Sequence, residues 1–168
     1  MEKPQYLKLA RQRPNDWAFN RPPEWEFFDY KLDKAEAAER EGDREKAFQI
    51  CLEIITSCPE YLPAINKLGL FFREQGDLDK AIHMFESAMG VGLACLPDDF
   101  ETGTDLIPWY WEDNRAFLLA CEYLGLCHLD KALDAYGYLL EINPDYRGIA
   151  DLVAKLHKIL GIEDEDIK

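Results

Sequence analysis

The chain has 168 residues, which is long enough for one domain with a substantial core. It carries 33 Asp and Glu residues against 19 Lys and Arg residues, so its formal net charge is −14. Nucleic acids and anionic membranes are bound by clustered Lys and Arg, so the charge argues against both as partners and permits a basic peptide or protein. No apolar run approaches the roughly 20 residues that span a bilayer. The first residues lack a secretory signal, and we therefore expect a cytoplasmic protein.

The sequence offers no candidate for catalysis or for metal binding. Five cysteines and three histidines show neither metal-ligand spacing nor a C-x-x-C pair, so we expect no metal, no cofactor and no disulfide framework. The motifs of phosphate-binding loops, zinc proteases and serine hydrolases are absent. Carboxylate pairs such as Asp98-Asp99 are expected by chance in so acidic a chain. We therefore expect a protein that is not an enzyme.

Residues 1–26 are expected to form an N-terminal arm outside the helical core. Tyr6 to Arg13 is compatible with a short helix, whereas Pro22-Pro23 favours an extended segment. Trp17 and Trp25 indicate that the arm packs against the body of the protein. The alternative is a displaceable arm that occupies a binding groove, and its deletion would then raise the affinity for partners.

Apolar residues at helical spacing predict four helices, at residues 26–41, 47–57, 61–75 and 79–89. Gly42-Asp43 and Gly76-Asp77 separate the two members of each pair. Glycine takes the left-handed conformation that ends a helix, and aspartate caps the start of the next one. Gly90 and Gly92 are expected to weaken the end of the fourth helix.

Residues 93–111 are rich in Pro, Gly and Asp and are predicted to form an irregular insertion. The insertion ends in an aromatic loop, Trp109-Tyr110-Trp111. A helix cannot bury three consecutive side chains on one face, so at least one of them should point elsewhere. We expect the loop to seal the joint between two helix pairs, and a clamp on a bound ligand is the alternative.

Three further helices are predicted, at residues 112–126, 130–142 and 149–160. The last of them ends at Gly161 and is expected to cover the apolar face that no further repeat would bury. The tail, residues 162–168, is acidic and is expected to fray.

The sequence repeats with a period of 34 residues. Gly42-Asp43-Arg44-Glu45-Lys46-Ala47 returns 34 positions later as Gly76-Asp77-Leu78-Asp79-Lys80-Ala81. A third copy, His128-Leu129-Asp130-Lys131-Ala132, lies 51 residues further on, which is one period plus 17. A repeat of this length is a helix–turn–helix unit that buries its apolar face only by stacking on its neighbours.

These spacings resemble those of the tetratricopeptide repeat family. The middle repeat matches best, with Leu68, Gly69, Phe72, Gly76, Ala81, Phe85 and Ala88 in register. The first keeps Ala38, Gly42, Ala47, Ile54 and Pro59, and the third keeps Leu119, Ala120, Tyr123, Ala132, Tyr136, Leu139 and Pro144. The resemblance implies an all-α fold, a right-handed α–α superhelix of about seven helices. The repeat domain would span residues 27–161.

In this family the first helices of successive repeats line a concave groove that binds peptides, so the resemblance implies a non-enzymatic protein-interaction module. The implied groove residues are Arg40, Asn66, Leu70, Arg73, Asn114, Phe117, Cys121 and Leu124, with Leu32, Glu36, Glu39, Pro63 and Glu74 as further groove-facing positions. The basic set that captures a C-terminal carboxylate in chaperone-binding members is not found, because Leu32 and Glu36 stand at the corresponding places. The alternative is a small acidic chaperone for one client, such as an exported protein, and such chaperones are often homodimers.

Overall fold

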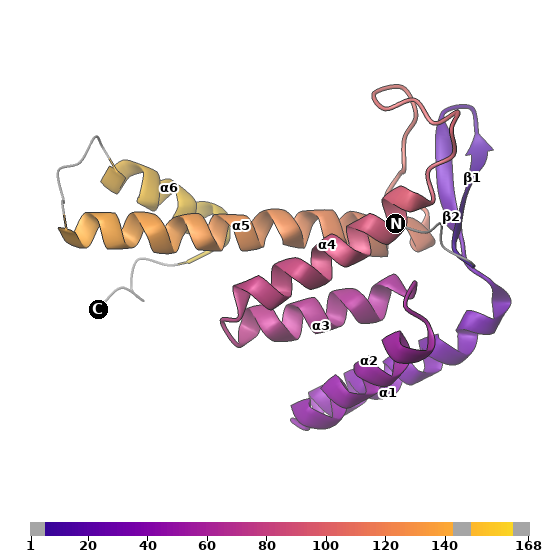
Figure 1. The fold of residues 1–168 in the computed structure, drawn as a ribbon, viewed down its shortest axis with the longest axis horizontal. Coiled ribbons are helices and arrows are strands. Elements are labelled where there is room, and N and C mark those ends of the chain that lie inside the picture. Colours follow the sequence, from indigo (N-terminus) through magenta and orange to yellow (C-terminus); the bar gives the residue numbers. More distant parts are fainter. Residues whose placement is uncertain (1–5, 143–148, 163–168) are drawn as a thin grey trace. The chain divides into compact units, whose positions relative to one another are not determined.

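The computed structural model describes residues 6–142 and 149–162. The chain divides into two compact units, residues 1–122 and 123–168. The fold is mostly all-α, as the sequence predicts, and it is consistent with a helical-repeat architecture. Within the described residues, the one sheet is a pair of antiparallel strands near the N-terminus (Figure 1).

The first unit opens with a β-hairpin formed by β1, Lys8–Arg13, and β2, Asp16–Asn20. Asn15 lies in the turn with a φ of 64°, a left-handed conformation that asparagine tolerates better than most residues. The short helix predicted for Tyr6 to Arg13 is therefore wrong. Buried and exposed side chains alternate at the start of β1, which is the period of a strand.

The hairpin packs into the core of the first unit. Trp17 and Phe19 of β2 are 4% and 1% exposed. After the hairpin a short 3-10 turn, η1, Pro23–Trp25, buries Trp25 as well. The arm is thus ordered and anchored by its tryptophans, as the packing interpretation expects.

Four helices follow in two pairs: α1, Glu26–Arg40; α2, Arg44–Ser57; α3, Leu62–Glu74; and α4, Leu78–Ala94. Consecutive helices pack side by side in chain order (Figure 1). The four predicted helices are confirmed, but α4 continues five residues beyond its predicted end. The two glycines expected to weaken it lie within the helix.

The turns inside the two pairs use the predicted chemistry. Gly42 and Gly76 have φ values of 86° and 77°, which ordinary side chains disfavour. Asp43 and Asp77 each accept a hydrogen bond from the backbone amide three residues further on, at 3.1 and 3.2 Å. Each Gly-Asp dipeptide thus ends one helix and starts the next.

The third pair predicted from the sequence is not formed. A 3-10 turn, η2, Glu112–Asn114, leads into a single helix, α5, Arg115–Ile142, and no turn interrupts it near residue 128. In the third copy of the repeat, Cys127 and His128 stand where the other copies have glycine and aspartate. Without the left-handed glycine and the capping carboxylate, the helix continues.

The second unit contains the rest of α5 and a final helix, α6, Ile149–Leu160, whose bounds match the prediction. Val153 and Leu156 of α6 are buried, and Gly161 follows the helix with a φ of 71°. The capping role of α6 stays a prediction. The predicted helix end at Pro144 and the acidic tail beyond Ile162 lie outside the described residues.

Candidate functional site

A pocket of about 200 Å³ lies in the first unit, where the N-terminal segment meets the starts of α1, α3 and α5. Its floor is mainly apolar and is formed by Leu7, Trp25, Leu32, Tyr61, Leu62, Pro63 and Ala116. Its rim carries four ionisable side chains, Arg21, Asp29, Glu112 and Asp113. Because α1 and α3 are the first helices of their pairs, the pocket opens between corresponding elements of two successive repeats.

Local sequence explains how the floor is formed. Pro22 and Pro23 start the 3-10 turn that buries Trp25, and the Trp25 ring packs edge-on against Tyr61 with centroids 5.4 Å apart. Tyr61 is 1% exposed and immediately precedes α3. Pro63 fits the first turn of that helix because an amide there has no intrahelical partner.

The rim is tied together by Arg21. Its Nη1 donates to Asp29 Oδ2 at 2.6 Å, and its Nε lies 3.0 Å from Asp113 Oδ1. The Tyr61 hydroxyl donates to the other oxygen of Asp29, Oδ1, at 2.6 Å. One guanidinium and three carboxylates, with Glu112 as the third, give the rim a formal charge of +1 − 3 = −2.

Burial raises the pKa of two groups at this site. Burial raises the pKa of Asp113 above its ordinary value, and the charge of Arg21 opposes this rise only in part. Burial and the hydrogen bond to Asp29 raise the pKa of Tyr61, which stays a neutral donor throughout the physiological range. Asp113 therefore carries a negative charge that its surroundings do not fully compensate.

Asn114 and Phe117, two predicted groove residues, hold the hairpin in place. Asn114 is fully buried, accepts a hydrogen bond from the Phe19 amide and donates to the carbonyls of Trp17 and Pro108, each at 2.9 Å. The Phe117 ring packs on that of Phe19 with centroids 5.4 Å apart. The amide of Asn114 is thus committed within the protein and is not open to a peptide.

Asn66 has a similar structural use. It is 5% exposed and donates from Nδ2 to the carbonyl of Ala116 at 2.7 Å, which joins α3 to the start of α5. Of the other predicted groove residues, Arg40 is exposed at the end of α1, Leu70 and Arg73 are half-buried on α3, and Cys121 is half-buried against the core. Leu124 is half-buried in the second unit.

The wider set of groove-facing positions divides in two. Leu32 and Pro63 are brought together in the pocket. Glu39 and Glu74 are instead engaged in ion pairs with Lys67 and Arg44. Glu36 is exposed on α1.

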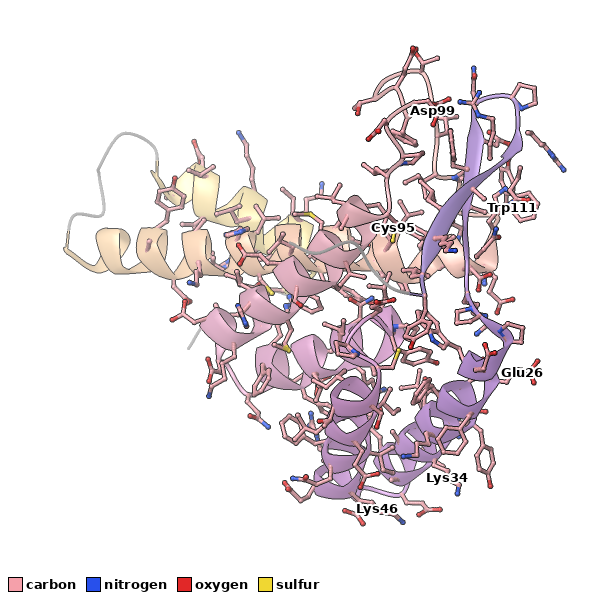
Figure 2. All side chains as sticks on the ribbon, turned by 45° about the vertical axis from the view of Figure 1, so that its right-hand side comes forward. Glu26, Lys34, Lys46, Cys95, Asp99 and Trp111 are labelled. Carbon is pink, nitrogen blue, oxygen red and sulfur yellow. The ribbon has the colours of Figure 1, made fainter. Side chains whose placement is uncertain are left out.

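The insertion is joined to the hairpin through its backbone, and the aromatic loop at its end exposes two of its rings. The Trp17 amide donates to the Leu106 carbonyl at 2.9 Å, the Leu106 amide donates to Asn15 at 2.7 Å, and Figure 2 places Trp111 beside the hairpin. Trp109 and Tyr110 are 51% and 56% exposed, whereas Trp111 is half-buried. Trp111 is thus the ring that is largely covered, and both the seal and the clamp stay predictions.

The ionisable rim of the pocket could not be recognised from the sequence. Arg21 and Asp29 lie eight residues apart, whereas Asp113 lies far along the chain, and only the fold brings all three together. The local signal was Trp25, which indicated that the arm packs against the body of the protein but not what it packs against.

The comparison with protein families agrees with the repeat pattern. The family described as tetratricopeptide repeat matches residues 62–91, which cover α3 and most of α4. No curated protein matches the chain. Residues 62–91 are therefore similar to a tetratricopeptide repeat, and the match supports a protein of this family.

This class is in general one of non-enzymatic scaffolds, and a repeat of this kind indicates a protein-interaction module with a protein as its partner. Within residues 6–142 and 149–162, no group of three or more His, Cys, Asp or Glu side chains is placed to hold a metal ion. None of the described helices has both the length and the apolar character needed to cross a membrane.

Proposed function

We propose that the first unit binds a segment of a partner protein along α1 and α3, with the pocket between them as the anchor point. The observation that supports this most directly is the position of the pocket. It opens between the first helices of two successive pairs, where the family resemblance implies a peptide groove, and Leu32 and Pro63 contribute to its floor. A concave, mainly apolar site with a few polar groups is the usual form of a binding site.

The predicted groove residues then have two different roles. Arg40, Leu70 and Arg73 lie on α1 and α3 and would contact the bound segment beyond the pocket. Asn66 and Asn114 would act through the structure, because their amides fix the start of α5 and the hairpin that surround the pocket. Phe117, Cys121 and Leu124 lie on α5 and are proposed to act in the same indirect way.

The test is selection of peptides from a random 12-residue phage-display library, followed by affinity measurement by fluorescence polarisation. Ala116→Phe fills the pocket and should weaken the selected peptides more than tenfold. Ala135→Phe makes the same change at an exposed position of α5 and should have no effect. Leu32→Ala removes part of the floor without adding bulk and should weaken binding to an intermediate degree.

Circular dichroism of each variant shows whether the fold is retained. Peptides that bind Ala116→Phe as well as they bind the unmodified protein would contradict the proposal, and so would a library that yields no binder.

A further inference from the structure

We infer that the pocket recognises an apolar side chain next to a lysine or arginine in the partner segment. This inference rests on the proposed function and specifies the chemistry of the partner. The pocket combines an apolar floor with a rim of net negative charge, so the two parts of the ligand follow from two independent features of the site.

The floor fits one apolar side chain. Pockets that hold a whole drug-sized ligand enclose about 300–1,000 Å³, and this one has a volume of about 200 Å³. Trp25, Tyr61 and Leu62 are each no more than 4% exposed, so the walls are supported by the core. A single aliphatic or aromatic side chain would displace water from this surface and gain the hydrophobic contribution of its burial.

The rim favours a cation. Its formal charge is −2, because Arg21 balances only one of its three carboxylates. Glu112 is exposed and has no ion-pair partner among the described residues. A lysine or arginine beside the bound apolar side chain would find this carboxylate uncompensated, while an acidic residue there would be repelled.

The field of the helix ends opposes this charge but does not cancel it. Each helix N-terminus carries about half a positive charge, so three of them would add about +1.5 against −2. At α3 the effect is smaller still, because Pro63 has no N–H group and the amides of Tyr61 and Ala64 already donate to backbone carbonyls. The net charge of the whole chain, −14, also attracts a cationic ligand.

The state of Asp113 supports the same conclusion. Its pKa is raised by burial and by the neighbouring carboxylates Glu112 and Asp29, and Arg21 offsets this only in part. A second cation at the rim would relieve the repulsion among the three carboxylates and lower the pKa of Asp113.

The test uses two charge changes with opposite expected effects on one selected peptide that contains a lysine or arginine. Glu112→Gln removes a rim carboxylate and should weaken binding about two- to fivefold, the range for one exposed ion pair. Arg21→Gln removes the internal cation and should strengthen binding by a similar factor. Glu86→Gln neutralises an exposed carboxylate outside the pocket and should leave the affinity unchanged. Replacement of the basic residue of the peptide by glutamine should abolish the difference between the Glu112 and Arg21 variants.

The outcomes separate this inference from the proposed function. Selected peptides that are sensitive to Ala116→Phe but have no basic residue overturn the inference alone, and so do Glu112 and Arg21 variants that shift affinity in the same direction. Insensitivity to Ala116→Phe overturns the proposed function as well. Should Arg21→Gln fail to fold, Asp113→Asn replaces it and should weaken binding as Glu112→Gln does.

Discussion

Substitution of Gly92 by alanine should destabilise the first unit, although alanine is the better helix former. Gly92 lies inside α4, and a Cβ atom there would stand 2.1 Å from Cδ2 and 2.6 Å from Cε2 of Phe117. The Phe117 ring is 7% exposed and packs against Phe19, so it cannot simply move aside. Either the ring leaves its position or α4 moves away from α5.

The magnitude follows from two opposing terms. Replacing a helical glycine by alanine is worth about 1 kcal/mol of stability, and overpacking a tight site costs about 1–3 kcal/mol. A distance of 2.1 Å places Gly92 near the upper end of that cost, which leaves a net loss of about 1–2 kcal/mol. Gly125 is the matched control, because no described atom beyond its own helix would lie within 4 Å of its Cβ. Gly125→Ala should therefore gain about 1 kcal/mol.

Urea unfolding followed by circular dichroism measures both variants, and the two alanine substitutions should differ by about 2–3 kcal/mol. In a thermal melt this corresponds to about 4–12 °C for a protein of this size. Combining Gly92→Ala with Phe117→Leu should recover part of the loss, as a non-additive double-mutant cycle. A Gly92→Ala variant as stable as Gly125→Ala would refute the argument from close packing.

Three further predictions concern the core, the hairpin and the pocket. Ala81 is fully buried, so Ala81→Leu should cost about 1–3 kcal/mol by overpacking, as measured by urea unfolding. Asn114→Ala leaves two buried backbone groups and one part-buried carbonyl without their partner, at about 1–3 kcal/mol for each buried unsatisfied group, and amide exchange of the hairpin should accelerate before that of α3. Affinity for a basic peptide should fall as the pH is lowered. Because its pKa is raised, Asp113 binds a proton at a higher pH than an ordinary aspartate does, so Asp113→Asn should show a weaker pH dependence between pH 7 and 4.

Much of the helical part of the fold could be predicted because its local signals agree with one another. Gly42-Asp43 and Gly76-Asp77 mark a turn through a required left-handed φ and a capping carboxylate, and the structure uses both. The hairpin could not be predicted in the same way. Its strands are short, and the period-two pattern around Leu7 and Leu9 overlaps a stretch that helical spacing also permits.

The single helix α5 shows where the repeat argument fails. The third copy retains Asp130-Lys131-Ala132, whose counterparts lie in the first turn of α2 and α4, and lacks the glycine and the cap that make the turn. Periodicity alone counted it as a repeat, while local backbone chemistry decides whether the chain turns. Replacement of Cys127-His128 by Gly-Asp should therefore create the missing break, detected as faster amide exchange at residues 126–129.

The pocket could not be predicted from the sequence for a related reason. Its charge depends on Arg21, Asp29 and Asp113, which have no common motif and are joined only because the hairpin leads Arg21 across the starts of α1 and α5. Asn114 fixes this arrangement by holding β2 to the start of α5. We therefore propose that the hairpin is part of the binding site and does not act as a plug in it. Deletion of residues 1–26 should accordingly remove Trp17 and Trp25 from the core and the Arg21 guanidinium from the rim. It should therefore reduce peptide affinity, whereas deletion of a displaceable arm would raise it.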